Sequence, residues 1–155
     1  MKEFTVPEDI NITMSVVGDI MCHDTQYKDA YVKDADSYDF SYVFSDIQKY
    51  LQVADIAVGN LETTFAGKDR GYSNYPTFNT PEVLGRNLKG IGFDVICTAN
   101  NHSMDKGYSG LESTLNFLDE YELGHYGTAR SKEEQDTIKK VVKILNNVGG
   151  IPCTA

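Results

Sequence analysis

Three short polar clusters follow apolar runs in this sequence, and each contains side chains that can bind a metal ion. The clusters are Gly18-Asp19 with His23, Asn60-Leu61-Glu62, and Asn100-Asn101-His102 with Asp105. Carboxylate, imidazole and amide oxygen groups are the usual protein ligands of divalent cations. A bound cation can acidify a water molecule and polarise a phosphoryl or carbonyl oxygen, so these residues indicate hydrolysis.

The spacing of the clusters predicts that they meet at one edge of a parallel sheet. Asp19, Asn60 and Asn101 recur at equal intervals, each long enough for one strand and one crossover helix. Apolar, β-branched runs predict strands that end at the clusters, at residues 12–17, 54–58 and 93–98. Right-handed βαβ connections bring such strand ends together, where the ligand crevice of an α/β sheet lies.

Helical periodicity and capping signals predict the elements between and after these strands. The expected helices are 40–51, 81–91 and one that begins near Ser109, and the further strands are 123–126 and 138–145. Thr80 is the expected N-cap of the second helix and Gly92 its end. Ser109 with Glu112 fits a capping box, and Ser131 fits the cap of a last short helix.

Each cluster, taken alone, also has a structural explanation that competes with metal binding. Gly18-Asp19 is typical of a turn or helix cap, and Asn60-Leu61-Glu62 of a turn followed by a solvated glutamate. Two consecutive amides and an imidazole after an apolar strand are poorly suited to a core, and the shared sheet edge favours the functional interpretation. His23 and Asp105 are candidates for orienting the ligands, while Asp105 also fits a helix cap.

The long connection 63–80 is a second candidate for contact with a ligand. It is rich in Gly, Ser, Asn and aromatic residues, and it contains Arg70, Tyr72 and Tyr75. Loops of this length in a compact domain are usually functional or disordered. The aromatic residues favour an ordered loop that covers the site and contacts substrate, and an ordinary surface excursion is the alternative.

The composition argues against several classes of function. The chain has 14 basic and 23 acidic residues and a net charge of −9, so its field repels nucleic acids and anionic membranes. An anionic substrate would need a local cation, which a bound metal supplies. The sequence shows no signal peptide, no membrane-spanning segment and no glycine-rich nucleotide motif.

These residues resemble the bacterial capsule-synthesis CapA family, also called the poly-γ-glutamate synthesis proteins, which shares the calcineurin-like metallophosphatase fold. The matching elements are Gly18-Asp19-Ile20-Met21, Gly59-Asn60-Leu61-Glu62, Tyr75-Pro76-Thr77-Phe78-Asn79-Thr80-Pro81, Gly92-Phe93-Asp94-Val95, and Ala99-Asn100-Asn101-His102-Ser103-Met104-Asp105-Lys106-Gly107. The resemblance covers residues 12–130, and the Asn-Asn-His block after Gly-Phe-Asp-Val is its most specific part.

The resemblance implies a divalent metal site, with Mn, Zn or Fe as candidate ions. The implied ligands are Asp19, Asn60, Glu62, Asn101 and His102, and Asp19 and His102 are also implied as catalytic residues. The implied substrate is an anionic polymer or a phosphoester, and the implied location is the cell envelope or the exterior. A non-catalytic module that binds polymer or supports assembly during capsule export is the alternative.

The resemblance also implies that the chain is part of a larger unit. The predicted organisation is an N-terminal extension at 1–11, a partial CapA-like α/β domain at 12–145 and a C-terminal tail at 146–155. Such a domain is the N-terminal half of an α/β/β/α sandwich, and the further histidine motifs of the family would follow it. One sheet face of half a sandwich is uncovered, so a missing C-terminal half or a second copy of the chain is expected there.

Overall fold

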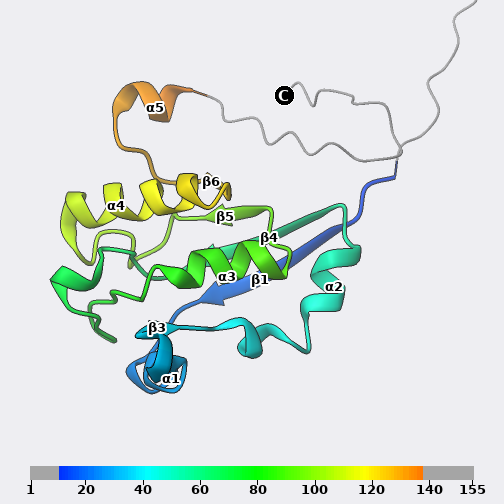
Figure 1. Ribbon diagram of the computed structural model, residues 1–155. Coiled ribbons are helices and arrows are strands. Elements are labelled where there is room, and N and C mark those ends of the chain that lie inside the picture. Colours follow the sequence, from blue (N-terminus) through cyan, green and yellow to red (C-terminus); the bar gives the residue numbers. More distant parts are fainter. Residues whose placement is uncertain (1–10, 138–155) are drawn as a thin grey trace, which may run out of the picture.

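A four-stranded parallel sheet forms the centre of the protein, as the computed structural model shows for residues 11–137 (Figure 1). Its strands are β1 (Met14–Ile20), β4 (Ile56–Leu61), β5 (Val95–Cys97) and β6 (Gly124–Tyr126), in the order β1-β4-β5-β6. Every neighbouring pair is parallel. The predicted α/β fold with βαβ crossovers is therefore confirmed.

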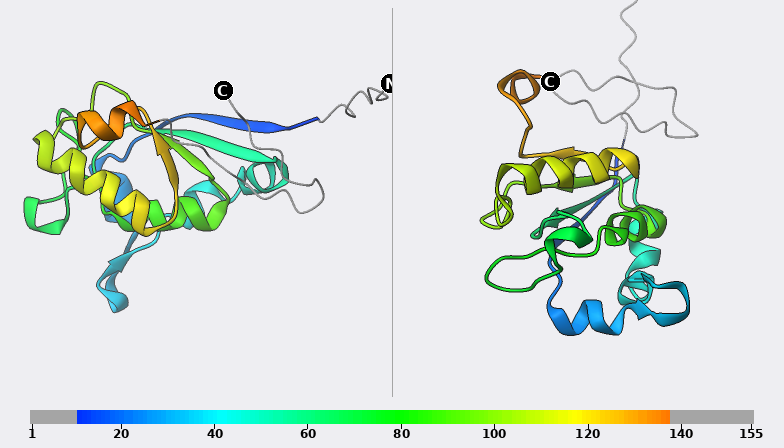
Figure 2. Two further views of the ribbon diagram at one scale, coloured as in Figure 1. Left: turned by 90° about the horizontal axis from the view of Figure 1, so that it is seen from above. Right: turned by 60° about the vertical axis from the view of Figure 1, so that its left-hand side comes forward.

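Helices cover one face of this sheet. The main ones are α2 (Gln48–Val53), α3 (Val83–Ile91) and α4 (Gly107–Glu120). Leucines of α3 and α4 at helical spacing, including Leu84, Leu88, Leu111 and Leu115, pack with Ala57, Leu61 and Ile96 of the strands in one core. In the view from above, α3 and α4 lie together on one side of the strands (Figure 2).

The opposite face of the sheet is largely uncovered within the described residues. Successive residues of a strand alternate between faces, so Met14 and Val16 point away from the helices. They are 59% and 71% exposed, and Tyr126 at the other edge strand is 49% exposed. Among residues 11–137, this face therefore presents apolar side chains outward. This arrangement matches the uncovered face expected from the sequence.

Polar contacts fix the alignment of β1 against β4 at its beginning. The Thr13 backbone N–H and the Thr13 hydroxyl both donate to Asp55 Oδ2, at 2.7 and 2.8 Å. The Asp55 N–H in turn contacts the Thr13 hydroxyl at 3.1 Å. Further along, a bulge between Val17 and Asp19 places Asp19 opposite Asn60.

Several predicted boundaries are wrong. The second strand ends at Leu61 instead of residue 58, and the N-cap of α3 is Glu82 instead of Thr80. Strand β1 does not end before Gly18 but continues to Ile20, because Asp19 and Ile20 still pair with β4. The helix predicted at 40–51 is split into a 3₁₀ turn at Ser41–Phe44 and the short helix α2. Asp39 Oδ1 accepts from the Ser41 N–H at 2.9 Å, a local hydrogen bond that offers the backbone an alternative to helix.

The predicted capping box at the start of α4 is also wrong. The helix begins at Gly107, and the Ser109 hydroxyl accepts a hydrogen bond from Arg70 Nη2 at 2.7 Å. The cap of the last helix is confirmed, because the Glu134 N–H donates to the Ser131 hydroxyl at 3.1 Å. The strand predicted at 138–145 lies outside the described residues.

The remaining elements are short. They are α1 (Asp24–Asp29), β2 (Tyr31–Val32), β3 (Ser37–Tyr38), α5 (Lys132–Asp136) and 3₁₀ turns at Lys33–Ala35 and Lys68–Arg70. Strands β2 and β3 form a separate antiparallel pair. Across residues 11–137, no helix combines the length and apolar character that crossing a membrane requires.

Candidate functional site

The carboxyl ends of β1, β4 and β5 bring the three polar clusters together, as predicted. Asp19 and Asn60 stand opposite each other in register, and Asn60 Nδ2 donates to Asp19 Oδ1 at 2.7 Å. Asn100, just after β5, donates from Nδ2 to Asn60 Oδ1 at 3.3 Å. These contacts form one polar edge across three strands, and we call the cluster of Asp19, Asn60, Glu62, Asn100, His102 and Asp105 the polar edge.

Two carboxylates of the polar edge perturb each other. The hydrogen bond from Asn60, followed by the contact with Glu62, lowers the pKa of Asp19. Burial, and then the neighbouring Asp19, raises the pKa of Glu62. Neighbouring carboxylates whose pKa values move apart in this way favour holding one proton or one cation over carrying two full negative charges.

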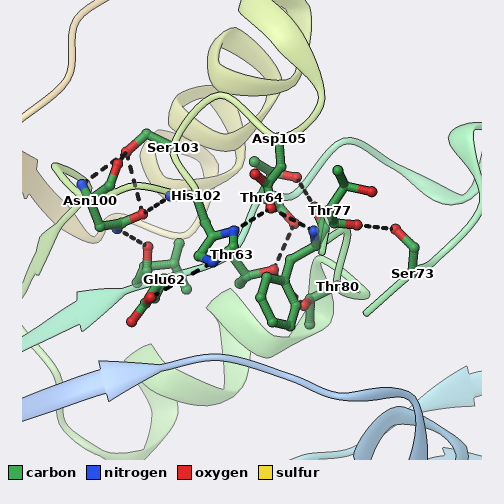
Figure 3. Close-up of polar contacts among 12 residues, drawn as sticks. Glu62, Thr63, Thr64, Ser73, Thr77, Thr80, Asn100, His102, Ser103 and Asp105 are labelled. Atoms are coloured by element: carbon green, nitrogen blue, oxygen red, sulfur yellow. Dashed lines mark hydrogen bonds and ion pairs between the residues drawn. The ribbon is translucent and has the colours of Figure 1, made fainter. Parts of the chain in front are cut away.

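His102 lies between two carboxylates in a nearly buried position (Figure 3). Its Nδ1 is 2.7 Å from Asp105 Oδ2, and its Nε2 is 3.9 Å from Glu62 Oε1. The carboxylate of Asp105 accepts hydrogen bonds, so Nδ1 is the ring nitrogen that donates in this contact. Nε2 faces Glu62. The orienting role predicted for Asp105 is consistent with this contact.

Asn100 makes more contacts in the polar edge than the sequence suggested. Its Nδ2 donates to the Leu61 carbonyl at 2.8 Å, and its Oδ1 accepts from the His102 N–H at 3.0 Å. The hydroxyl of Ser103 also accepts from the Asn100 N–H at 3.0 Å. Asn101, the predicted metal ligand, lies exposed in the same turn. Its role as a ligand stays a prediction.

His23 approaches the polar edge through an aromatic neighbour. It precedes α1, where its N–H donates to Gln26 Oε1 at 2.7 Å. Its ring packs against Phe78 with centroids 5.3 Å apart, and Phe78 packs against His102 with centroids 4.7 Å apart. His23 is thus linked to His102 by one intervening ring.

The three residues predicted to contact substrate lie in the connection 63–80 but have different surroundings. Arg70 donates to the Lys106 carbonyl at 3.2 Å and to Ser109, which ties the connection to the start of α4. The Tyr72 hydroxyl donates to Glu82 Oε2 at 3.1 Å. Tyr75 is exposed and precedes a cis peptide bond to Pro76. Contact of these residues with substrate stays a prediction.

The connection 63–80 is ordered by a buried asparagine that the sequence did not single out. Asn79 is 0% exposed. Its Oδ1 accepts from the Ala66 N–H at 2.8 Å, and its Nδ2 donates to the Gly67 and Gly71 carbonyls at 3.0 and 2.9 Å. This asparagine therefore holds the beginning, the middle and the end of the connection together. The expectation of an ordered connection is therefore met.

The donor atoms of the polar edge fit part of a metal centre. Two atoms that each lie about 2.1 Å from one ion can be at most about 4.2 Å apart, and His102 Nε2 and Glu62 Oε1 are 3.9 Å apart. Within residues 11–137, however, no group of three or more His, Cys, Asp or Glu side chains is arranged to hold a metal ion. The described residues therefore offer an incomplete ligand set.

Comparison of the sequence with known proteins shows which family and which proteins it is similar to. Residues 13–152 match the family described as bacterial capsule synthesis protein PGA_cap. The capsule biosynthesis protein CapA of Bacillus anthracis is 29% identical over 151 residues, which cover 93% of this chain and 34% of that protein. The PGA biosynthesis protein CapA of Bacillus subtilis is 29% identical over 142 residues, covering 90% of this chain and 35% of that protein.

A relative from another genus shows a similar level of identity. The uncharacterized protein y4sH of Sinorhizobium fredii is 32% identical over 117 residues, which cover 71% of this chain and 25% of that protein. The chain thus spans about a third or less of the length of these relatives. Because the family match extends over nearly the whole sequence, the chain belongs to the bacterial capsule synthesis protein PGA_cap family.

Proposed function

We propose that the polar edge is the metal-binding site of a hydrolase-type domain that acts in capsule or poly-γ-glutamate biosynthesis or processing. The observation that supports this most is the pair formed by His102 and Glu62. Its two donor atoms lie 3.9 Å apart at the end of the sheet, a separation that one divalent ion can bridge. Membership of the capsule synthesis family supports the biological role.

The ligands that we propose are His102 through Nε2, Glu62 and Asp19 through their carboxylates, and Asn60 and Asn101 through their amide oxygens. A bound Mn, Zn or Fe ion would supply Lewis acidity for hydrolysis. The protein's own residues would orient the site, since Asp105 holds Nδ1 of His102 at 2.7 Å. His102 and Asp19 are the residues that we expect to touch the reacting groups.

The substrate that we propose is an anionic polymer or a phosphoester, at the cell envelope. A chain with a net charge of −9 repels anions at long range, so a cation at the polar edge would be needed to hold such a substrate. Arg70, Tyr72 and Tyr75 are the proposed substrate contacts in the connection 63–80. The alternative is a non-catalytic module that grips the polymer through the same edge.

The uncovered sheet face supports a further part of the proposal. Met14, Val16 and Tyr126 expose apolar surface on one side of the sheet, and the relatives are about three to four times longer than their matched parts. We propose that the C-terminal part of such a longer protein covers this face and completes the ligand set. A second copy of the chain is the alternative occupant.

The experiment that tests metal binding is a titration with Mn²⁺ or Zn²⁺, followed by thermal unfolding. We expect the melting temperature of the wild type to rise with metal concentration, because an ion that binds only the folded state stabilises it. His102→Ala should remove this rise. His125→Gln is the matched control, since His125 is also buried and contacts Asp119 at 3.0 Å but lies outside the polar edge.

Turnover of p-nitrophenyl phosphate and of poly-γ-glutamate then separates the two functions. Metal-dependent turnover that His102→Ala abolishes supports the hydrolase. Metal binding without turnover of either compound supports the binding module. If metal does not raise the melting temperature and His102→Ala changes neither stability nor turnover, the metal-site proposal is wrong.

A further inference from the structure

We propose that Phe78 is a positioning residue, which sets the orientation of His102 and couples it to the connection 63–80. This inference rests on the proposed function of the polar edge as a metal site. Phe78 is 1% exposed and comes from a loop, whereas His102 follows β5 on another part of the chain. Two separate contacts join them, one through the backbone of Phe78 and one through its ring.

The backbone contact runs through a single oxygen atom. Asp105 Oδ2 accepts from the Phe78 N–H at 2.6 Å and is also 2.7 Å from His102 Nδ1. One carboxylate oxygen therefore holds the loop and the imidazole together. Any shift of the loop at Phe78 changes the position of the oxygen that orients His102.

The ring contact restrains the plane of the imidazole. The rings of Phe78 and His102 are 4.7 Å apart and inclined by 85°, the edge-to-face geometry that aromatic pairs prefer. The ring of His23 packs against Phe78 in the same manner, at 5.3 Å and 84°. The ring of Phe78 thus packs between the segment after β1 and the turn after β5.

These restraints leave the Nε2 edge of His102 facing Glu62. Nδ1 is engaged by Asp105 and the ring packs against Phe78, so these two contacts together set the direction of Nε2. A ligand that displaces the connection 63–80 would remove the ring contact with His102 and the hydrogen bond from Phe78 to Asp105. Binding of a ligand to that connection would therefore lower the affinity of His102 for a cation.

The test compares two variants that each lose a buried aromatic ring. Phe78→Leu removes the ring beside His102, and Phe93→Leu removes an equally buried ring that contacts Phe44 instead. Long-range ¹H–¹⁵N spectra at pH 8 report which imidazole nitrogen carries the proton, and ring currents alter these nitrogen shifts little. Phe78→Met replaces the leucine variant if that variant does not fold.

We expect the wild type and Phe93→Leu to show His102 with its proton on Nδ1, and Phe78→Leu to show a mixture of tautomers. Mn²⁺ should bind Phe78→Leu about 10-fold more weakly, the lower end of the loss seen when partners of metal ligands are removed. Equal tautomer populations and equal Mn²⁺ affinity in both variants would overturn the inference. If the wild type binds no Mn²⁺, the proposed function fails, and the tautomer comparison still decides the role of Phe78.

Discussion

Replacing Asn79 by alanine should destabilise the protein far more than a surface substitution does, because its side chain satisfies backbone groups of the connection 63–80. Asn79→Ala removes the acceptor of the Ala66 N–H and the donor to the Gly67 and Gly71 carbonyls. The carbonyl of the alanine backbone stays in place. The variant therefore isolates the contribution of three side-chain hydrogen bonds.

The loss in free energy of unfolding depends on how well water reaches each backbone group that loses its hydrogen bond to Asn79. Ala66 is buried, so its unpaired N–H costs about 1–3 kcal/mol. Gly67 is half-buried, and losing its hydrogen bond costs about 0.5–1.5 kcal/mol. Gly71 is exposed, and water replaces the lost donor at almost no cost. The expected loss in free energy of unfolding is about 1.5–4.5 kcal/mol, a large part of the about 5–15 kcal/mol of a typical domain.

Urea unfolding followed by far-ultraviolet circular dichroism measures this loss, because the chain contains no tryptophan for fluorescence. Asn116→Ala is the control, since Asn116 is exposed on α4 and should change stability by less than about 0.5 kcal/mol. The slope of the unfolding curve should be unchanged. A loss below about 1 kcal/mol for Asn79→Ala, within the range of a single exposed hydrogen bond, would refute the reasoning that buried backbone groups depend on this side chain.

Two further predictions concern the core. Gly59→Ala should destabilise the fold by about 1–3 kcal/mol in urea unfolding, because an added Cβ would lie 2.7 Å from Ile20 Cδ1 and 2.9 Å from Phe93 Cε1. Gly18→Ala is the control and should be tolerated, because no atom lies within 4 Å of its added Cβ. Equal losses of stability in the two variants would contradict the packing argument. Burial raises the pKa of the Cys22 thiol from 9.0 to about 12. The folded state then keeps its proton where the unfolded state loses it, so stability should fall between pH 9 and pH 12. Thermal unfolding across this range should show a smaller fall for Cys22→Ala, and an unchanged fall would argue against the shift.

The sheet and its polar edge were predictable because they depend on local patterns. Apolar runs that end at Asp19, Asn60 and Asn100 define both the strands and the side of the sheet on which the clusters meet. A glycine after the helix 83–91 gave its end, since Gly92 adopts a positive φ of 114° that favours glycine. These signals lie within a few residues of the structure that they predict.

Features that depend on distant contacts were not predictable in the same way. The choice between Asn100 and Asn101 is made by the turn geometry, which decides which amide points toward Leu61. The capping box at Ser109 is absent because α4 begins earlier, at Gly107, and the Ser109 hydroxyl instead accepts from Arg70 of a distant loop. The contacts of Phe78 and Asn79 likewise require the folded loop. The composition of the connection 63–80 indicated an ordered loop, but it did not show which residues hold that loop in place.

The hydrogen bonds between Thr13 and Asp55 form a clamp that holds β1 in register with β4. Among the strands of residues 11–137, β1 lies at the edge of the sheet beside β4, and a slip of one residue would turn its side chains to the opposite face. Weakening the clamp would therefore misdirect Asp19 from the far end of the strand. Substitutions at Thr13 or Asp55 would therefore alter the polar edge through the alignment of the strands, although neither residue belongs to it.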